Sequence, residues 1–309
     1  MNILVYGIGG VGGYFGGKLA TTAHHTTFIA RGKHLEAIRK NGLKVNSFQG
    51  DFLVRPDIAT DRPDETPSPH LILLGVKSWQ LTETAKTLSP YLNSETIVLP
   101  LQNGADNPDK IKKHIPEHQI LAGFCNVISF IESPGIIRHA AFDPILSFGE
   151  LNNRKSARAL RIKDVFEEAG INSRIPEDIH REIWRKFMFI TTISGLGGLT
   201  RVPVGTMRKS PYLYQMMRDT ANEILKLAQA KQINLTQADV EKVFEIIDGQ
   251  DPESTASTQR DIMSGKPSEL ENFNGYVVKE AGKFDIPVPV NEMIYQCLLP
   301  MEKKAGNHT

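Results

Sequence analysis

The feature that most constrains this chain is a glycine-rich turn near its start. An apolar segment at residues 3–6 leads directly into Gly7-x-Gly9-x-x-Gly12, and a run of small residues follows. Glycines at this spacing allow a tight turn, close approach of the backbone to a pyrophosphate and close packing of the next helix on the strand. The start of that helix would offer amide donors to the anion. The turn predicts a dinucleotide-binding domain, with the cofactor held by Gly7, Ile8, Gly9, Gly10, Val11 and Gly12.

The first half of the chain alternates short apolar runs with amphipathic segments. We expect strands at residues 3–6, 27–30, 71–76, 96–101, 120–128 and 145–148, and helices at 14–20, 34–41, 80–91, 106–114 and 155–169. Continuous apolar strands that alternate with helices are typical of a parallel sheet covered on both faces. The pattern predicts a Rossmann-type, doubly wound α/β domain over residues 1–176. Consecutive strands between residues 123 and 149 indicate that the sheet is mixed at that edge.

Beyond residue 176 the apolar spacing becomes helical almost throughout. Helices are predicted at residues 182–194, 212–230, 237–247, 270–282 and 292–301, with no strand among them. A chain of 309 residues suits two domains. We therefore expect an all-helical domain over residues 177–309, and a ligand in the cleft between the two domains.

Charge and cysteine content narrow the class of protein. The chain has 36 Lys and Arg against 35 Asp and Glu, so its net charge of +1 gives no reason to expect nucleic acid or an anionic membrane as partner. Neither a signal peptide nor an apolar run long enough to span a bilayer is evident. Cys125 and Cys297 lie far apart and resemble no metal or redox pair. The prediction is a cytoplasmic enzyme without a metal, acting on a small molecule, with self-association into a homodimer left open.

The residue after the second predicted strand bears on the choice of cofactor. A Rossmann domain that uses NAD carries an acidic residue there for the ribose hydroxyls, but here the strand runs into Ala30-Arg31-Gly32-Lys33. A guanidinium pairs well with a 2′-phosphate, which a carboxylate would repel. Arg31 therefore favours NADPH/NADP⁺. The alternative is that Arg31 is an ordinary solvated turn residue.

Several further motifs occur in a fixed order along the chain. They are Val76-Lys77-Ser78-Trp79-Gln80, Gln102-Asn103-Gly104, Trp184-Arg185-Lys186-Phe187, Ser257-Thr258-Gln259-Arg260-Asp261 and the stretch from Glu269 to Gly275. Together with the glycine turn and Arg31, this ordered set resembles the ketopantoate reductases (2-dehydropantoate 2-reductases). The resemblance covers nearly the whole chain.

The resemblance implies an activity and a role for each matching residue. It implies NADPH-dependent reduction of 2-dehydropantoate to (R)-pantoate in pantothenate biosynthesis, with Lys186 binding the substrate and donating the proton. Negative charge develops on the carbonyl oxygen as hydride adds to the ketone carbon, so a positioned cation with a proton suits this step. Asn103 is expected to touch cofactor and substrate, Lys77 and Glu269 the cofactor, and Ser257 the substrate carboxylate.

One departure from the family pattern concerns the substrate. The family has asparagines four and eight residues after the lysine, on the same helix face. This chain has Ile190 and Ser194, which are still expected to face the substrate. Ile190 cannot bond a hydroxyl, so a D-2-hydroxyacid dehydrogenase acting on a bulky apolar 2-ketoacid is the alternative. A catalytically silent NADPH-binding redox sensor is the second alternative, and it would need none of Lys186, Asn103, Ser257 and Glu269.

Overall fold

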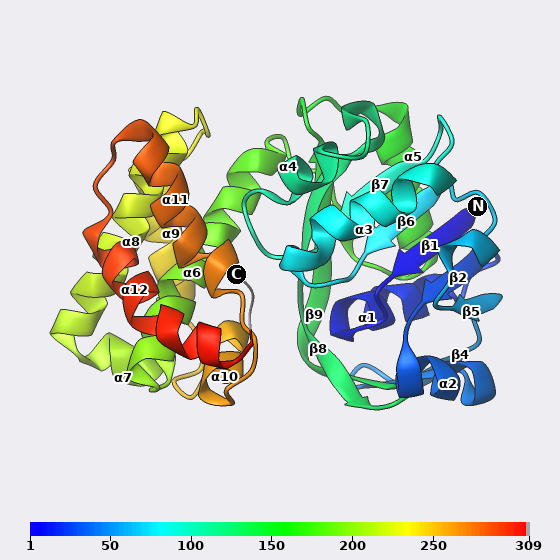
Figure 1. Cartoon of the computed structure of the whole chain (residues 1–309), viewed down its shortest axis with the longest axis horizontal. Coiled ribbons are helices and arrows are strands. Elements are labelled where there is room, and N and C mark those ends of the chain that lie inside the picture. Colours follow the sequence, from blue (N-terminus) through cyan, green and yellow to red (C-terminus); the bar gives the residue numbers. More distant parts are fainter. Residues whose placement is uncertain (307–309) are drawn as a thin grey trace. The chain divides into compact units, whose positions relative to one another are not determined.

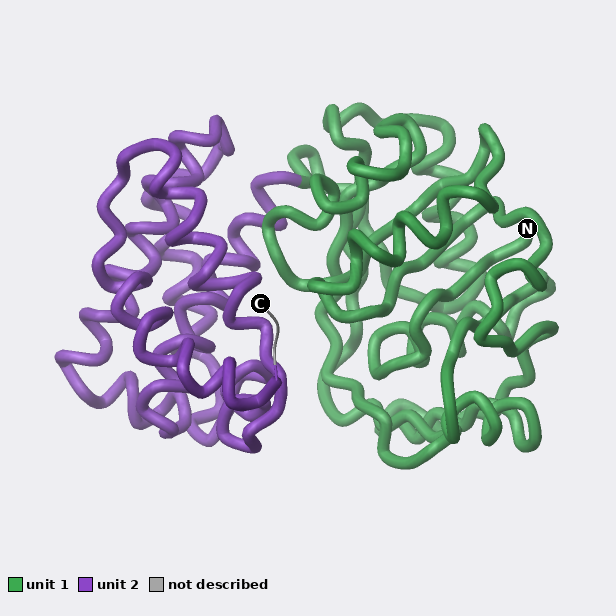
Figure 2. The backbone as a smooth tube through the Cα atoms, in the orientation of Figure 1, with its two compact units in different colours: residues 1–179 green, residues 180–309 purple. Residues whose placement is uncertain are grey.

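A computed structural model of the chain contains two compact units, Met1–Ile179 and His180–Thr309, and describes residues 1–306 (Figure 2). We call them the N-terminal unit and the C-terminal unit. The division lies three residues beyond the boundary expected from the change of pattern at residue 176. It falls inside the first turn of a helix, α6 (Ile179–Thr200), so the pattern change marks the end of the last strand, not the end of the unit.

A five-stranded parallel sheet forms the centre of the N-terminal unit (Figure 1). Its register pairs Tyr6 with Ile29 on one side and with Leu74 on the other, and Leu74 with Pro100. Four neighbouring strands therefore end at the same level, and the segments that follow them emerge along one edge. In spatial order the strands are β5 (Ile58–Thr60), β2 (His25–Ile29), β1 (Asn2–Tyr6), β6 (Leu71–Leu74) and β7 (Ile97–Pro100).

Helices cover both faces of this sheet because its strands are apolar on both sides. Ile3 and Val5 pack in one core with α1 (Gly10–Leu19), α2 (Gly32–Asn41) and α5 (Ala157–Glu168). Leu4 and Tyr6 pack on the other face with α3 (Leu81–Leu88) and α4 (Asn107–Lys112). Side chains alternate between the faces of a strand, so continuous apolar strands need cover on both. The doubly wound fold predicted from the sequence is confirmed.

A second sheet lies beside the first, and the expectation that the parallel sheet is mixed at one edge is wrong. The consecutive strands after residue 120 form a long antiparallel hairpin in this second sheet, and a single isolated bridge, Val98 to Ile120, joins it to β7. Beyond Ile128 the pairing continues with register shifts, through residues that are largely exposed. The second sheet has the order β10 (Ser173–Arg174), β9 (Ile136–Glu150), β3 (Leu43–Ser47) and β4 (Phe52–Val54), with β8 (Leu121–Ser133) on β9.

Short 3₁₀ turns connect several of these elements. They are η1 (Pro63–Glu65), η2 (Ser78–Gln80), η3 (Ser89–Tyr91) and η4 (Glu117–Gln119).

The C-terminal unit contains only helices among its described residues, as predicted. The helix expected at residues 270–282 is divided, because Phe273 leaves the helical conformation with φ −111° and ψ −97°. Two short helices, α7 and α10, were not predicted. After α6 the elements are α7 (Val204–Lys209), α8 (Pro211–Ala230), α9 (Gln237–Asp248), α10 (Ser257–Met263), η5 (Leu270–Asn272), α11 (Asn274–Ala281), η6 (Gly282–Phe284) and α12 (Pro289–Lys304).

Glycines in the second half of α6 let two other helices approach it closely. A Cβ atom on Gly195 would lie 2.5 Å from Oδ1 of Asn274, the first residue of α11. A Cβ atom on Gly197 would lie 2.5 Å from Oε1 of Gln259 in α10. Real Cβ atoms do not approach other atoms this closely, so the Asn274 and Gln259 side chains pack where a larger residue of α6 would displace them. The glycines thus bring these residues of α10 and α11 close to the α6 backbone.

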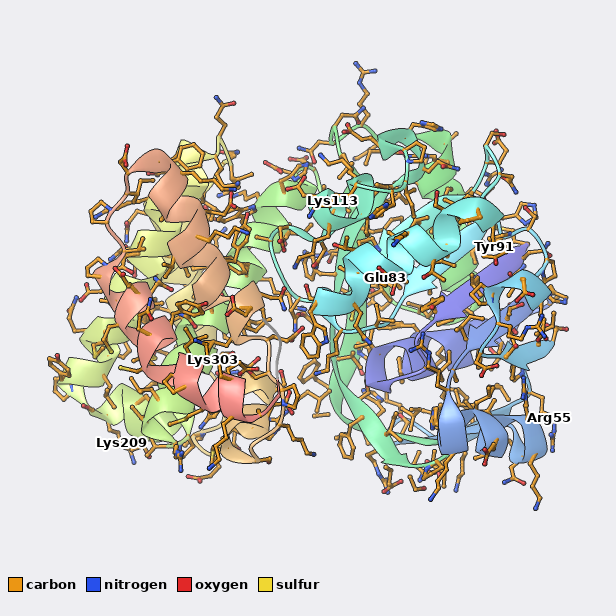
Figure 3. The ribbon with its side chains drawn as sticks, viewed as in Figure 1. Arg55, Glu83, Tyr91, Lys113, Lys209 and Lys303 are labelled. Atoms are coloured by element: carbon orange, nitrogen blue, oxygen red, sulfur yellow. The ribbon has the colours of Figure 1, made fainter. Side chains whose placement is uncertain are left out.

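Charged side chains of both signs lie on the surface of each unit. Arg55, Glu83 and Lys113 are exposed in the N-terminal unit, and Lys209 and Lys303 in the C-terminal unit (Figure 3). Within residues 1–306, no helix has the combination of length and apolar character that a membrane span requires.

Candidate active site

The residues predicted to bind the cofactor follow four neighbouring strands of the parallel sheet. Gly7 comes directly after β1, Arg31 two residues after β2, Lys77 three residues after β6 and Asn103 three residues after β7. Because these strands are parallel and end at the same level, all four segments leave the sheet at its carboxyl edge. Open α/β sheets bind their ligands at this edge.

The glycine turn is held by contacts that leave no room for side chains. Gly7 has φ +94°, a conformation that favours glycine, and its amide donates to the carbonyl of Ile29 at 3.0 Å. A Cβ atom on Gly12 would lie only 2.1 Å from the Gly7 carbonyl oxygen. On Gly75, which follows β6, it would lie 2.6 Å from the same oxygen. Three glycines therefore let β1, β6 and the start of α1 meet at one carbonyl.

Gly9 differs from these glycines, because nothing in the protein requires it. It is the N-cap of α1, and a Cβ atom there would meet no atom closer than the Gly75 carbonyl oxygen, at 3.9 Å. The first amides of a helix have no partner within the helix, and the helix dipole favours an anion beside them. A glycine that leaves open space over a helix N-terminus fits a pyrophosphate placed against the backbone.

A segment that sequence reasoning did not assign also borders the turn. A Cβ atom on Gly10 would lie 2.1 Å from the backbone oxygen of Ser129, so β8 passes directly against the start of α1. Ile128 and Phe130, on either side of Ser129, are exposed apolar residues. The only sequence signal for this contact is Gly10, a glycine of the turn that the Gly-x-Gly-x-x-Gly spacing does not itself require.

Arg31 occupies the position expected for a residue that reads the cofactor ribose. It is the N-cap of α2, with extended backbone, and its side chain is exposed. Ala30 before it donates to the Thr60 carbonyl at 3.0 Å, which ties the end of β2 to β5. Glu65, in η1 beyond β5, accepts a hydrogen bond from the Thr60 hydroxyl at 2.6 Å and pairs with Arg62 at 3.4 Å.

A network of side-chain amides fixes the backbone around Asn103. Gln102 donates through Nε2 to the carbonyls of Leu74 and Val76, at 2.7 and 2.9 Å, so it clamps the end of β7 to the end of β6. Asn107 donates through Nδ2 to the carbonyls of Gln102 and Asn103, at 2.9 and 3.3 Å. Asn103 itself is half-buried. Gln102 and Asn107 therefore hold the site in place, a role that only the contacts reveal.

The segment that carries Lys77 is attached to the same network. The hydroxyl of Ser78 donates to Oδ1 of Asn107 at 2.9 Å, and the backbone amide of Lys77 donates to the Gln80 side chain at 3.1 Å. The Lys77 ammonium lies 5.6 Å from the centre of the Trp79 ring. The exposed lysine thus offers a positive charge at the sheet edge to the anionic groups of a ligand.

In the C-terminal unit, large aromatic residues fix the rotation of α6 around its axis. Trp184 and Phe187 are buried, with ring centres 5.6 Å apart, and Phe187 packs edge-on against Tyr276 of α11, also at 5.6 Å. Lys186 lies between Trp184 and Phe187 in the sequence and is partly exposed. Its α-helical spacing places Ile190 and Ser194 one and two turns further on the same side.

Ion pairs with a buried carboxylate hold the first turns of α6 on α9. Asp239 is fully buried and accepts from Nε and Nη2 of Arg181, both at 3.0 Å, while Arg185 lies 3.6 Å from it. Arg185 also bonds Glu182 at 2.5 Å. Burial raises the pKa of Asp239, but hydrogen bonds from Arg181 and Thr236 outweigh it and leave this pKa below its usual value. Sequence reasoning missed this anchor next to Lys186.

The two positions that depart from the family pattern differ in exposure. Ile190 is partly exposed, whereas Ser194 is buried and its hydroxyl meets no hydrogen-bond partner among the described residues. A buried hydroxyl without a partner is costly and needs an explanation. Thr191 and Thr192 of the same helix have buried hydroxyls in the same state, so the feature is shared by this stretch of α6.

Ser257 and Glu269 lie at the starts of short elements in the same unit. Ser257 is the exposed first residue of α10, which contacts α6 through Gln259. Glu269 is the buried N-cap of η5, and its carbonyl accepts from the amides of Asn272 and Phe273. The turn places it five residues before Asn274, the residue that contacts α6 at Gly195.

Models of one known protein family match both units of the chain. The model of the N-terminal domain described as "Ketopantoate reductase PanE/ApbA" matches residues 3–153, and the model of the C-terminal domain of the same family matches residues 178–302. The chain belongs to the ketopantoate reductase family. The family consists of oxidoreductases that act on CH–OH groups.

Individual members of the ketopantoate reductase family match over their whole length. A 2-dehydropantoate 2-reductase of Pyrococcus abyssi is 28% identical over 306 residues, which cover 99% of each chain. The crystal structure of a PanE/ApbA family ketopantoate reductase from Ralstonia eutropha JMP134 superposes with a TM-score of 0.91, at 26% identity, covering 99% of this chain and 100% of the other. A ternary structure of D-mandelate dehydrogenase with NADH and anilino(oxo)acetate has the same fold, with a TM-score of 0.89, 23% identity and coverage of 99% and 100%.

Proposed function

We propose that this protein reduces 2-dehydropantoate to (R)-pantoate with NADPH, in pantothenate biosynthesis, and that Lys186 donates the proton. The observation that carries the proposal is the joint presence of two half-sites in a member of the ketopantoate reductase family. One is the glycine turn with Arg31, Lys77 and Asn103 along a single sheet edge. The other is Lys186 on a helix face fixed by its aromatic neighbours.

The N-terminal unit supplies the groups that hold a dinucleotide. The amides at the start of α1 bind the pyrophosphate, and the exposed guanidinium of Arg31 pairs with a 2′-phosphate. Lys77 adds positive charge at the same edge, and the amide of Asn103, on its clamped backbone, contacts both cofactor and substrate. In the C-terminal unit Glu269 contacts the cofactor. A bound nicotinamide cofactor supplies the hydride that reduces the ketone carbon.

The C-terminal unit supplies the proton and the substrate contacts. The Lys186 ammonium bonds the ketone oxygen, stabilises the negative charge that develops there and donates its proton to complete the alcohol. Ser257 bonds the substrate carboxylate. Ser194 and Ile190, on the Lys186 face of α6, contact the remainder of the substrate.

A second candidate is a D-2-hydroxyacid dehydrogenase that acts on a bulky apolar 2-ketoacid. Ile190 favours it, because an aliphatic side chain on the substrate-facing side of α6 offers no hydrogen bond to a distal hydroxyl. A structure of the same fold is that of a D-mandelate dehydrogenase with NADH and anilino(oxo)acetate.

The test is the fall in NADPH absorbance with a panel of 2-ketoacids that includes 2-dehydropantoate, 2-ketoisovalerate and phenylglyoxylate. We expect turnover in the wild type and a loss of at least about a hundredfold in kcat for Lys186→Ala, because general acid catalysis contributes at least that much. NADPH affinity, measured by fluorescence, should be unchanged in this variant. Lys226→Ala, which removes an exposed lysine of α8, is the matched control and should retain full activity.

Two results would contradict the proposal. A fall of only a few-fold in Lys186→Ala would mean that this lysine is not the proton donor. Demonstrated NADPH binding without turnover of any ketoacid would favour a redox sensor over an enzyme.

A further inference from the structure

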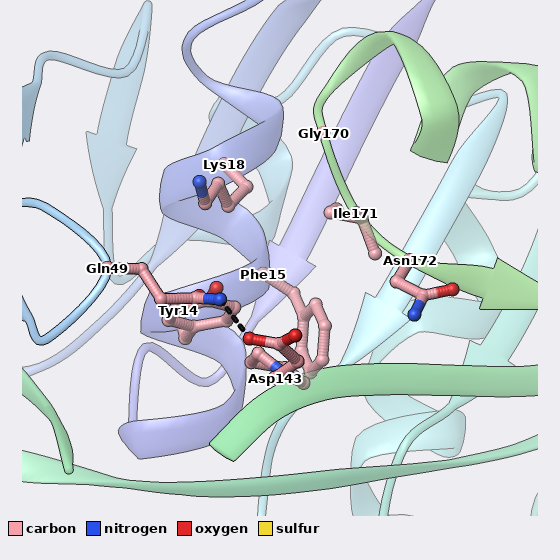
Figure 4. A pocket seen from close by; sticks show the side chains of 9 residues that line it. Tyr14, Phe15, Lys18, Gln49, Asp143, Gly170, Ile171 and Asn172 are labelled. Atoms are coloured by element: carbon pink, nitrogen blue, oxygen red, sulfur yellow. Dashed lines mark hydrogen bonds between the residues drawn. The ribbon is translucent and has the colours of Figure 1, made fainter. Parts of the chain in front are cut away.

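A pocket in the N-terminal unit lies away from the glycine turn. It has a volume of about 300 Å³ and opens between the second half of α1, the turn before β4, β9 and the loop before β10 (Figure 4). Lys18 lies eight residues beyond the start of α1, which is about 12 Å along the helix axis. A ligand in this pocket therefore does not occupy the position of a pyrophosphate at the turn.

The phenol of Tyr14 is the buried polar group of this pocket. Only 4% of the residue is exposed, and its ring packs against His139 and Phe15, with ring centres 4.6 and 5.3 Å away. Its hydroxyl bonds no other group among residues 1–306, and the oxygen is not itself fully buried, so it is available to a ligand in the pocket. Burial, together with the nearby Asp143 carboxylate, raises the pKa of Tyr14, so the hydroxyl keeps its proton and can donate.

Two opposite charges line the pocket without pairing with each other. The Lys18 ammonium lies 5.1 Å from the centre of the Phe52 ring and forms no ion pair with any residue that the structure describes. Asp143 accepts one hydrogen bond, from the side-chain amide of Gln49 (Figure 4), and forms no ion pair in the described part of the chain. A charge of each sign is thus available to a ligand.

The position of Asp143 is held by the residue before it. Phe142 has φ +38°, a strained conformation for an aromatic residue, and its carbonyl accepts a hydrogen bond from Nε2 of His139 at 3.0 Å. Because a carbonyl only accepts, Nε2 must carry the hydrogen. The buried His139 also bonds the Ser47 hydroxyl through Nδ1 at 2.9 Å. This chain of contacts fixes the backbone that presents the carboxylate.

We infer that this pocket binds a free α-amino acid with a small aliphatic side chain. The ligand ammonium pairs with Asp143, and its carboxylate accepts from Lys18 and the Tyr14 hydroxyl. Phe15, Pro144 and Ile171 supply the apolar part of the lining, against which an aliphatic side chain packs. The volume, at the lower end of the range for ligand pockets, suits a small ligand better than a nucleotide.

Calorimetric titration of the full chain with L-valine tests the inference. We expect saturable binding that weakens at least about tenfold in Asp143→Asn and in Lys18→Met, because each loses a charge-assisted hydrogen bond. Tyr14→Phe keeps the ring contacts and should also weaken binding at least about tenfold, because the lost hydrogen bond is to the charged ligand carboxylate. Isovalerate lacks the ammonium group and isobutylamine lacks the carboxylate, so both should bind at least about tenfold more weakly than L-valine.

Controls separate this site from the proposed active site and from misfolding. Lys186→Ala and Lys86→Met, which removes an exposed lysine of α3, should bind L-valine as the wild type does. Thermal melting of each variant shows whether it is folded. The inference is overturned if L-valine gives no saturable heat, if isovalerate binds as tightly as L-valine, or if the Lys18→Met/Asp143→Asn double variant retains wild-type affinity. Loss of binding in Lys186→Ala would place the ligand in the active site and overturn it as well.

Discussion

Arg31 shows how a single exposed side chain can select a cofactor. We expect Arg31→Ala to raise the KM for NADPH roughly tenfold or more and to leave the KM for NADH nearly unchanged, because a hydrogen bond to a charged group contributes about 1.5–3 kcal/mol. Steady-state kinetics with each cofactor measures this. Lys33→Ala, an exposed cation two residues away on α2, is the control and should change neither value much. Equal effects on both cofactors would mean that Arg31 does not contact the 2′-phosphate.

Ile190 is the residue that we expect to influence substrate preference most. Ile190→Asn should raise kcat/KM for 2-dehydropantoate and lower it for 2-ketoisovalerate, because the amide can bond the distal hydroxyl that only the former carries. A hydrogen bond between uncharged groups is worth about 0.5–1.5 kcal/mol, so each change should be roughly two- to tenfold. The quantity to measure is the ratio of the two efficiencies. An unchanged ratio would show that position 190 does not face the substrate.

At the scale of the element, the turn between β1 and α1 contains one glycine needed for stability, Gly12, and another, Gly9, expected to serve cofactor binding. Gly12→Ala should lower stability by about 1–3 kcal/mol, because its Cβ would lie 2.1 Å from the Gly7 carbonyl oxygen. Gly9→Ala should change stability by less than about 0.5 kcal/mol, because its Cβ meets nothing closer than 3.9 Å. The Gly9 variant should instead bind NADPH more weakly. Urea unfolding and fluorescence titration of both variants measure the two effects, and wild-type affinity in Gly9→Ala would contradict this account of the turn.

At the scale of the whole molecule, buried carboxylates in each unit make the protein sensitive to acid. The pKa of Glu150 in the N-terminal unit is raised by burial but lowered more by Arg158 and Ser156, and the pKa of Asp239 in the C-terminal unit is lowered by Arg181 and Thr236 despite burial. A lowered pKa in the folded state stabilises the fold above the unfolded pKa, about 3.9 for Asp and 4.3 for Glu. This stabilisation is lost as pH falls through the lower, folded-state pKa.

We therefore expect thermal stability to fall as the pH decreases below about 4. Glu150→Gln and Asp239→Asn should each be less stable than the wild type at pH 7, and the difference should shrink on acidification. Scanning calorimetry from pH 7 to pH 3 measures this. Glu241→Gln is the control for Asp239→Asn: it removes a carboxylate of the same helix that pairs with Arg218 at 2.7 Å but is half-exposed, and its cost should be small. A difference that stays constant with pH would mean that these carboxylates act only through packing.

Local patterns in the sequence determined the parts of this protein that depend on residues close together in the chain. Gly7, Gly9 and Gly12 after an apolar strand indicate the turn, because the close contact of Gly12 with the Gly7 carbonyl lies within six residues. The apolar runs predicted as strands at residues 3–6 and 71–76 and the helical spacing beyond residue 176 likewise indicated the two architectures. The helix that carries Lys186 was predicted at residues 182–194 from the same kind of local spacing.

Contacts between distant residues decided what no local pattern showed. The short strands β3 and β5 pair with residues far away in the chain, β3 with residues 136–139, and neither has a long apolar run of its own. Asp239 is 58 residues from Arg181, and Gln102 is 28 residues from Leu74, so their bonds exist only once the helices and strands have packed. A polar side chain looks alike in sequence whether it faces solvent or clamps a site. The two cases differ in burial, because a buried polar side chain can form hydrogen bonds only with other groups of the protein.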